Sequence, residues 1–387
     1  MMTQEMGKPI DQSKAEVEKS AACCEYYAEH AEQMLQPQVV QTEASCSEIH
    51  FQPMGTILAI MPWNFPVWQV VRCAAPALMA GNRILLKHAL NVCGCAEMIQ
   101  AVFDDSFGEM AVCNIRVPHE DAASLIQTHH VQAVTLTGSE RAGSEVGKVA
   151  GEAIIKCVME LGGVDPFIVL EDADIETTVA AAVRSRILNN GQSCIAAKRF
   201  ILMKSIADEF TECFVEQMKQ LKMGDPMDPE TELGPLARKD LRDALHEQVI
   251  FRTERLHGTL LCGGVIPDRS GWFYPPTVIS QTYVDTDNHI RETFGPVAMI
   301  EVNQDDRVPM SHVTHSEYGL GASIWTQDID RARKVASGLR CGSVFVNEIT
   351  KSDPRLPFGG VGRSGYGREL SEFGLREFTN IKTIWIK

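Results

Sequence analysis

The sequence predicts an α/β protein with two doubly wound parallel-sheet domains and a small β ribbon outside them. From Gly55 onward, the β-rich runs TILAIM, RILLK and VQAVTLTG are each followed by a helical pattern. A second series of the same kind starts at PFIVL. Such alternation is typical of parallel sheets with helices on both faces. A chain of 387 residues is also too long for one hydrophobic core.

The helices and strands of the two series follow in order. In the first series, helices are expected from Pro66, over Asn91–Phe103 and from Ser139. In the second, they are expected over Ile175–Leu188 and Ile206–Leu221. The remaining apolar runs, AKRFILM, TLLCGG, PVAMIEV, GASIWT and GSVFVN, predict the strands of the second sheet.

Two stretches lie outside both series. QPQVVQTEASCSEIHFQP follows an N-terminal helix that ends near Leu35, and EFTNIKTIWIK ends the sequence. Both alternate polar and apolar residues, as half-exposed strands do. Because an exposed strand edge invites a partner, we predict pairing into a homo-oligomer, a dimer or a tetramer. The alternative is that both are ordinary edge strands covered within one chain.

The composition excludes several classes of protein. The 36 basic and 51 acidic residues give a formal charge of −15, which repels nucleic acid. The start, MMTQEMGKPIDQSK, lacks the pattern of a secretory signal, and residues 55–71 are too interrupted by proline to span a membrane. The 12 cysteines show neither a disulfide framework nor zinc-ligand spacing. We therefore predict a cytoplasmic protein without a metal site.

Two acidic or nucleophilic side chains could carry chemistry. Cys194, in NNGQSCIAAKRF, lies between a glycine turn and a strand, so its side chain can face a cleft. The alternative is a packed thiol, since free cysteine is among the most buried residue types. Glu160, in MELGGVDPFIVL, ends a β-rich run at the junction of the two series, where a carboxylate could serve as a base. The alternative is an exposed charge at a strand end.

Two loops could bind anionic groups. In IMPWNFP, two prolines bracket Trp63 and Asn64, so the loop presents the Asn64 amide rigidly, as an oxyanion donor requires. In LTGSERAG, Gly138 and Ser139 lie between a strand and a helix, whose N-terminus could bind a phosphate.

Six motifs together resemble the aldehyde dehydrogenase superfamily: PWNFP, LTGS, ELGG, GQSC, ETFGPV and PFGGVGRSGYGRE occur in this order at the expected intervals. The resemblance runs from about Thr3 to the C-terminus. NNGQSCIAAKRF, LLKHA and SDPRLPFGGVGRSGYGREL are most similar to the bacterial succinate-semialdehyde dehydrogenase branch. The resemblance implies NAD(P)-dependent oxidation of a small semialdehyde, such as succinate semialdehyde, to the carboxylate through a cysteine thioester.

The resemblance also implies a division of the chain. An NAD(P)-binding domain would comprise residues 1–35 and 52–160, and a catalytic domain residues 161–357. Residues 36–51 and 375–387 would form the oligomerisation strands, and residues 358–374 would return to pack on the cofactor domain.

Roles of single residues follow from the same resemblance. Cys194 would attack the aldehyde carbon, Asn64 and the Cys194 backbone N–H would hold the oxyanion, and Glu160 would deprotonate the hydrolytic water. Arg72 would hold the substrate carboxylate, the alternative being a helix salt bridge. The residues that would contact NADP or NAD are Trp63, Lys87, Leu90, Gly138, Ser139, Leu161, Glu292 and Phe294.

The chain departs from the family pattern in several places. It begins later than typical family members, DSFGEMAVCNIRV replaces the turn that flanks the adenine, and Leu188 and Val164 replace an arginine and a lysine. Leu90 replaces a glutamate that favours NAD, which predicts that NADP is accepted at least as well. Three alternatives stay open: a paralogue with this fold and little activity, a CoA-acylating dehydrogenase, which Glu160 disfavours, and a cysteine hydrolase, for which no histidine motif accompanies Cys194.

Overall fold

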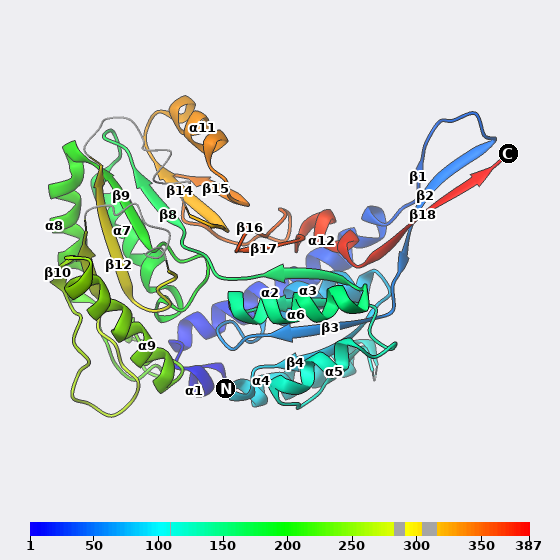
Figure 1. The fold of residues 1–387 in the computed structure, drawn as a ribbon, viewed down its shortest axis with the longest axis horizontal. Coiled ribbons are helices and arrows are strands. Elements are labelled where there is room, and N and C mark those ends of the chain that lie inside the picture. Colours follow the sequence, from blue (N-terminus) through cyan, green and yellow to red (C-terminus); the bar gives the residue numbers. More distant parts are fainter. Residues whose placement is uncertain (109, 282–290, 304–315) are drawn as a thin grey trace.

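The chain forms two α/β lobes and a narrow β ribbon that projects from one of them (Figure 1). The computed structural model describes residues 1–108, 110–281, 291–303 and 316–387. Residue 109, within the stretch predicted to flank the adenine, lies outside the described residues. The predicted α/β class, with one large sheet in each lobe and a separate ribbon, is confirmed.

The first lobe contains a six-stranded sheet in the order β17-β7-β6-β3-β4-β5. Strands β3 to β7 are parallel, and β17 is antiparallel to β7. Their bounds are β3 Thr56–Met61, β4 Arg83–His88, β5 Val112–Asn114, β6 Ala133–Thr137, β7 Lys156–Glu160 and β17 Gly365–Tyr366. The direction of winding reverses beside β3, so a crevice is expected where β3 and β6 end.

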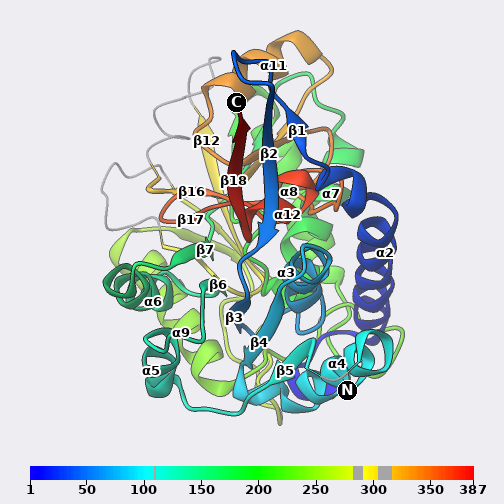
Figure 2. The ribbon, with the colours of Figure 1, turned by 90° about the vertical axis from the view of Figure 1, so that its right-hand side faces the viewer.

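Helices cover both faces of this sheet because apolar residues alternate along its strands. Ile57 and Ala59 belong to the core under α2, α3 and α4, whereas Leu58 belongs to the core under α5 and α6. Figure 2 shows α2 on one side of the sheet and α5 and α6 on the other. The helices of this lobe are α1 Met2–Met6, α2 Ile10–Met34, α3 Trp68–Met79, α4 Cys93–Phe107, α5 Ala122–Ile126 and α6 Glu140–Ala153, with the short η1 Leu90–Val92 and η2 His119–Asp121.

The N-terminal helix predicted up to about Leu35 is in fact two helices, α1 and α2. Gly7 ends α1 with a φ of 78°, in the left-handed region that glycine adopts without a steric penalty. Pro9 then precedes α2, where its missing N–H costs no hydrogen bond. The helical spacing of glutamate and alanine concealed this break.

The second lobe contains a seven-stranded sheet in the order β10-β11-β12-β9-β8-β14-β15, parallel except for β10. Its strands are β8 Pro166–Val169, β9 Arg199–Met203, β10 Thr259–Cys262, β11 Thr277–Ser280, β12 Val297–Asn303, β14 Gly321–Trp325 and β15 Ser343–Val346. Its helices are α7 Ile175–Ile187, α8 Lys204–Gln220, α9 Lys239–Ile250 and α11 Ile329–Gly338, with η3 Leu188–Gly191 and η4 Phe251–Arg255. Helices α7, α8 and α11 share one apolar core with the sheet.

After β15 the chain returns to the first lobe. Strands β13 Tyr318–Gly319 and β16 Val361–Gly362 pair with each other, and β17 then extends the first sheet. Helix α12, Ser371–Glu377, spans the boundary predicted at residue 374. Phe358, Leu370 and Leu375 complete the core under α2 and α3. The assignment of cofactor binding to one lobe and of the nucleophile to the other stays a prediction.

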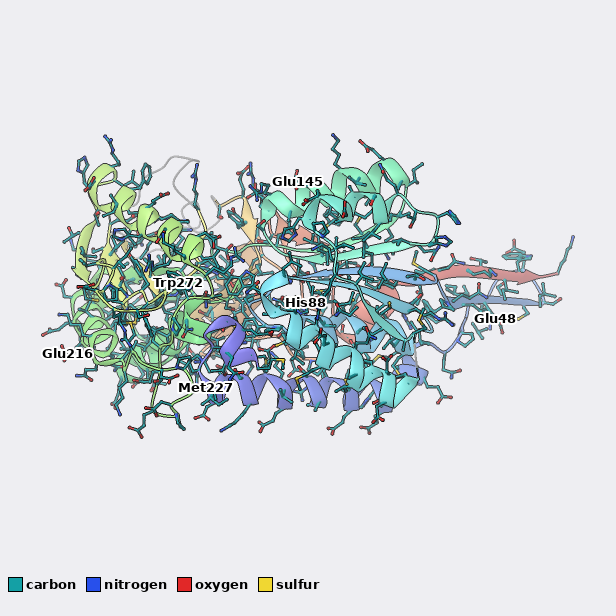
Figure 3. All side chains as sticks on the ribbon, turned by 90° about the horizontal axis from the view of Figure 1, so that it is seen from below. Glu48, His88, Glu145, Glu216, Met227 and Trp272 are labelled. Carbon is teal, nitrogen blue, oxygen red and sulfur yellow. The ribbon has the colours of Figure 1, made fainter. Side chains whose placement is uncertain are left out.

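The ribbon consists of β1 Gln38–Val39, β2 Cys46–Pro53 and β18 Thr379–Ile386. Strand β18 pairs with the whole of β2, from Thr379 opposite Pro53 to Ile386 opposite Cys46. Figure 3 shows this ribbon, marked by Glu48, extending away from the body of the molecule. The apolar side chains exposed on it are Val39, Ile381, Trp385 and Ile386.

Among the described helices, none is both long enough and apolar enough to cross a bilayer. The cytoplasmic location and the absence of a metal site, both expected from the sequence, stay predictions.

Candidate active site

Cys194 lies on the loop that connects α7 to β9. Asn189, Asn190 and Gly191 have φ values of 56°, 57° and 74°, so three successive residues adopt the left-handed conformation. Asparagine and glycine tolerate this conformation better than other residues, which explains the NNG start of the motif. A side chain at Gly191 would collide with the backbone of Gly295, so the loop packs directly against the ETFGPV segment.

Two buried cations hold this loop from behind. The Arg186 guanidinium donates to the carbonyl oxygens of Gly191, at 2.8 Å, and of Ala197, at 2.7 Å. The Lys198 ammonium donates to the carbonyl oxygens of Ser193, at 2.8 Å, and of Cys194, at 2.5 Å. Both cations are almost fully buried, so they fix the loop backbone on either side of the thiol.

The Cys194 thiol resists ionisation in this structure. The side chain is partly exposed, but the protein packed around it raises the pKa of the thiol to about 12. The positive charges of Lys198 and Arg72 act in the opposite direction, because they stabilise a thiolate. To act as a nucleophile, Cys194 would have to lose its proton against the effect of burial.

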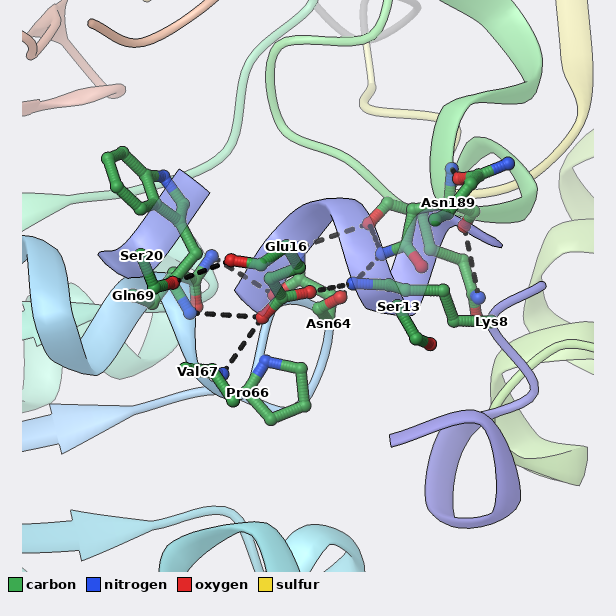
Figure 4. Close-up of polar contacts among 12 residues, drawn as sticks. Lys8, Ser13, Glu16, Ser20, Asn64, Pro66, Val67, Gln69 and Asn189 are labelled. Carbon is green, nitrogen blue, oxygen red and sulfur yellow. Dashed lines mark hydrogen bonds and ion pairs between the residues drawn. The ribbon is translucent and has the colours of Figure 1, made fainter. Parts of the chain in front are cut away.

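Asn64 is buried beside the Cys194 loop. Its side-chain Nδ2 donates to the backbone carbonyl oxygen of Gln192 at 3.0 Å. The backbone carbonyl oxygen of Asn64 accepts from Asn189 Nδ2 at 2.5 Å. Figure 4 labels Asn64, in the loop after β3, and Asn189, in the loop before β9. The Asn64 amide is thus bonded to the residue two positions before Cys194, and its predicted role as an oxyanion donor stays a prediction.

Glu160 ends β7 inside the protein, not at its surface. Its carbonyl accepts from Gly138 N–H at 2.9 Å, but neither carboxyl oxygen has a hydrogen-bond partner among the described residues. Burial, and then the nearby charge of Glu369, raise the pKa of Glu160 well above its ordinary value, while Arg72 and Arg368 oppose the rise. A carboxyl group with a raised pKa in an interior site suits a general base.

Arg72 lies on α3 with its guanidinium buried. It forms a salt bridge with Glu369, donates to Thr137 Oγ1 at 3.2 Å and lies 4.6 Å from the centre of the Phe358 ring. The structure therefore contains the salt bridge that the sequence left as the alternative, although the partner is the returning C-terminal segment and not the same helix. The predicted contact of Arg72 with a substrate carboxylate stays a prediction.

The crevice beside β3 and β6 has the features of a phosphate site. Gly138 and Ser139 follow β6, and the Ser139 hydroxyl accepts from Ala142 N–H at 3.3 Å as the N-cap of α6. A cavity of about 980 Å³ opens there. It is lined by Ser139, Glu140, Arg141, Ser144, Glu145, Gly162, Arg291, Glu292, Glu317, Tyr318 and Arg363. A helix N-terminus that faces a cavity can bind a pyrophosphate, so these residues fit a dinucleotide.

The Glu292 side chain contacts both glycines of the ELGG motif, Gly162 and Gly163. Its Oε1 accepts from Gly163 N–H at 3.2 Å and lies 3.4 Å from Lys198 Nζ. A side chain at Gly162 would come within 2.5 Å of the Glu292 carboxylate, so Glu292 lies directly against this glycine. Glu292 thus links the Cys194 loop to the cavity beside α6.

Four other predicted cofactor residues are not among those that line this cavity. Trp63 and Phe294 meet edge to face, with ring centres 5.9 Å apart. The Nζ atom of Lys87, near the end of β4, lies 3.3 Å from His119 Nδ1. Leu90 is exposed at the start of η1.

Leu161 lies in the apolar core of the first lobe. It is buried in the apolar cluster under α6, and a side chain at Gly143 would collide with it. The structure therefore packs Leu161 against a helix, and its predicted contact with nicotinamide stays a prediction.

Sequence reasoning missed the buried residues that support the predicted ones. They are Gln69, Arg186, Lys198 and Glu369. Lys198 follows Cys194 by four positions in the motif, and Glu369 lies in GYGREL, so a charged residue inside each motif was the available signal. Glu369 contacts Arg72, which is distant in sequence. The other three also contact residues 4 to 11 positions away, through hydrogen bonds that no periodicity encodes.

Two doubly wound sheets that meet at a cysteine loop, with a helix N-terminus at the reversal of strand order, define a dinucleotide-dependent α/β enzyme. Residues 1–384 match the sequence model of the aldehyde dehydrogenase family. The chain therefore belongs to the aldehyde dehydrogenase family, and the predicted family and enzyme class are confirmed.

Similar proteins carry a more specific name. The chain is 50% identical over 386 residues to the NAD(P)+ succinate semialdehyde dehydrogenase Sad of Escherichia coli (strain K12), covering all of this chain and 83% of that protein. It is 47% identical over 392 residues to the NADP(+) succinate-semialdehyde dehydrogenase of Mycobacterium leprae (strain TN), a match that covers 100% of this chain and 85% of that protein. The solved succinic semialdehyde dehydrogenase of Streptococcus pyogenes, in complex with NADP+, is 35% identical with a TM-score of 0.96, again covering 100% and 85%.

Proposed function

We propose that this protein oxidises succinate semialdehyde to succinate, with NADP or NAD as the hydride acceptor. The observation that carries the proposal is the Asn64 amide held against the Cys194 loop by its hydrogen bond to Gln192. The buried carboxyl of Glu160 lies on the strand that leads into the same region. The names of the similar proteins support the choice of aldehyde and of cofactor.

The chemistry divides between three residues of the chain. Cys194 Sγ forms a bond to the aldehyde carbon as the thiol proton leaves, and the Asn64 amide donates to the resulting oxyanion. A bound NADP or NAD would supply the hydride acceptor for this carbon, and Cys194 would then hold the acyl group as a thioester. Glu160 then takes a proton from water, whose oxygen attacks the acyl carbon and releases the carboxylate and the Cys194 thiol.

The cofactor would lie along the crevice of the first sheet. Gly138 and Ser139, at the N-terminus of α6, would meet the pyrophosphate. Lys87 and Glu292 would form hydrogen bonds with the two riboses. Phe294 would pack beside the nicotinamide. Transfer of the acyl group to coenzyme A is not favoured, because Glu160 supplies a base for water and the similar proteins named above are semialdehyde dehydrogenases.

The proposal is tested by the absorbance of reduced cofactor with succinate semialdehyde and with butanal, an uncharged aldehyde of similar size. Succinate semialdehyde should have the higher kcat/KM by roughly 10- to 100-fold, the usual contribution of a charge-assisted hydrogen bond. The product should be free succinate, formed without coenzyme A. Absence of cofactor reduction with both aldehydes would contradict the proposal.

Arg72→Met is expected to lower the free energy of unfolding by about 3–5 kcal/mol, because it leaves the buried Glu369 carboxylate without its partner. The second change Glu369→Gln should restore part of this loss. Urea denaturation of the single and double variants measures both effects. If KM for succinate semialdehyde rises in Arg72→Lys while KM for butanal does not, Arg72 also holds the substrate carboxylate. A stable Arg72→Met variant would contradict the structural role.

Leu90→Glu is expected to shift the preference from NADP toward NAD by roughly tenfold or more, because a carboxylate would repel a 2′-phosphate. Leu90 is exposed, so it is free to face a ribose, whereas Glu140 is held by Tyr318 at 2.8 Å and by Arg363. The ratio of kcat/KM for the two cofactors measures the shift. Val102→Glu, at an exposed position on α4, is the matched control. A strong NAD preference that Leu90→Glu leaves unchanged would contradict the prediction.

We also propose that the ribbon pairs with a second copy of the chain. Ile381 and Trp385 are about half exposed or more on a projecting three-stranded sheet, and such apolar edges invite a partner. Light scattering should give a multiple of the 42.8 kDa chain mass, and a monomer at that mass would exclude the pairing.

A further inference from the structure

Gln69 lies directly behind the Asn64 amide. It belongs to the first turn of α3 and is 2% exposed. Its Nε2 donates to Asn64 Oδ1 at 3.2 Å. Figure 4 shows both amides side by side in the polar network under α2.

The partners of Asn64 allow only one orientation of its amide. The carbonyl of Gln192 can only accept, so the atom of Asn64 that faces it must be the nitrogen. The oxygen then faces Gln69, whose Nε2 supplies a donor. In the reverse orientation, two oxygens would meet at Gln192 and two nitrogens at Gln69. The second N–H of Asn64 has no hydrogen-bond partner among the described residues.

The position of Gln69 is itself fixed from α2. The buried carboxylate of Glu16 accepts from the backbone N–H groups of Val67, at 2.8 Å, and Trp68, at 3.0 Å. Glu16 also forms a buried salt bridge with Lys8. A carboxylate at a helix N-terminus satisfies donors that lack helical partners, so this contact anchors the first turn of α3.

Stability does not explain the amide at position 69. Gln69 Oε1 is buried without a hydrogen-bond partner among the described residues. An unsatisfied buried oxygen is destabilising, and an apolar side chain of the same size would avoid that penalty. The group of Gln69 that makes a hydrogen bond is therefore its Nε2 donor, which faces Asn64 Oδ1.

We propose that Gln69 is a positioning residue, which holds the Asn64 amide with its free N–H directed at the oxyanion of the bound aldehyde. The inference rests on the proposed role of Asn64 as the oxyanion donor. Because the oxyanion exists only after attack by Cys194, the contribution should fall on kcat and not on KM.

Gln69→Met removes the donor and conserves the volume of the side chain. We expect kcat to fall roughly 10- to 100-fold, as part of the ~10²–10³-fold that loss of an oxyanion donor causes. KM and the rate at which iodoacetamide alkylates Cys194 should stay within about twofold, and the unfolding midpoint should not fall. Gln248→Met is the matched control, because Gln248 Oε1 is also buried without a partner but lies on α9. It should leave kcat unchanged.

A double-mutant cycle with Asn64→Ala separates positioning from any other effect. In the Asn64→Ala background, Gln69→Met should cause no further loss of kcat, since there is no amide to orient. Equal losses in both backgrounds, or a Gln69→Met variant as fast as the unmodified enzyme, would overturn the inference. If Asn64→Ala itself leaves kcat unchanged, the proposed oxyanion role fails, and the inference fails with it for that separate reason.

Discussion

Cys194→Ala is expected to abolish aldehyde oxidation, with a loss of kcat of roughly 10⁴-fold or more, as when a covalent nucleophile is removed from other enzymes. The loop that carries Cys194 is fixed by Arg186 and Lys198 through backbone carbonyls, and neither contact involves the thiol. The variant should therefore fold and bind NADP like the unmodified protein. Cofactor reduction and fluorescence titration with NADP measure the two properties.

Cys341→Ala is the matched control for this experiment. Cys341 is also partly buried, and burial raises the pKa of its thiol to about 12, as for Cys194. It lacks the neighbouring cations, Lys198 and Arg72, that stabilise a Cys194 thiolate. Full activity of Cys341→Ala beside an inactive Cys194→Ala would locate the nucleophile. Substantial oxidation by Cys194→Ala, with only its stability reduced, would show that the assignment is wrong.

The sequence predicted the parts of the fold that produce long alternating patterns. The parallel strands β3 and β6 and the helix α6 with its Ser139 cap lie where their patterns indicated. The two-residue strand β17 was missed, because two residues contain no alternation, and its pairing with β7 depends on a segment distant in sequence. The break between α1 and α2 was missed, although Gly7 and Pro9 marked it.

The candidate site was predictable only where a local motif carries the chemistry. The loop of Cys194 and the loop of Asn64 each contain their own conformational signals, the left-handed Asn189 and the bracketing prolines. The neighbours that set the charge of the site come from elsewhere: Glu369 lies beside Arg72 and Glu160 through tertiary packing alone. Its effect on the pKa of Glu160 could not be inferred from the position of either residue in the sequence.

These buried charges also connect the two proposed steps of the reaction. The charge of Arg72 favours the ionised forms of both Cys194 and Glu160, and Arg72 also forms the salt bridge with Glu369. Burial opposes both ionisations. Burial therefore favours the protonated forms of the Cys194 thiol and the Glu160 carboxyl in the resting structure. Since each proposed step needs one of these groups without its proton, the rates of thioester formation and hydrolysis should rise with pH.

Glu160→Gln is expected to separate the two steps. Glutamine has nearly the same volume but cannot accept a proton, so Cys194 should still form the thioester while its hydrolysis slows by roughly 10²–10⁴-fold. Rapid mixing with NADP and succinate semialdehyde should show a burst of reduced cofactor, up to one equivalent per active site, followed by slow turnover. Glu152→Gln, an exposed carboxylate near the end of α6 that does not line the cavity, is the matched control and should show neither change.

The pH dependence of the slow phase tests the same assignment. The pKa of Glu160 is raised by burial, so a base at this position is protonated at low pH, and hydrolysis in the unmodified enzyme should accelerate as pH increases through that pKa. Glu160→Gln has no such group, so its slow phase should lose this acceleration. A Glu160→Gln variant without a burst, in which the first turnover slows as much as later ones, would instead show that Glu160 acts on the Cys194 thiol or shapes the site before attack.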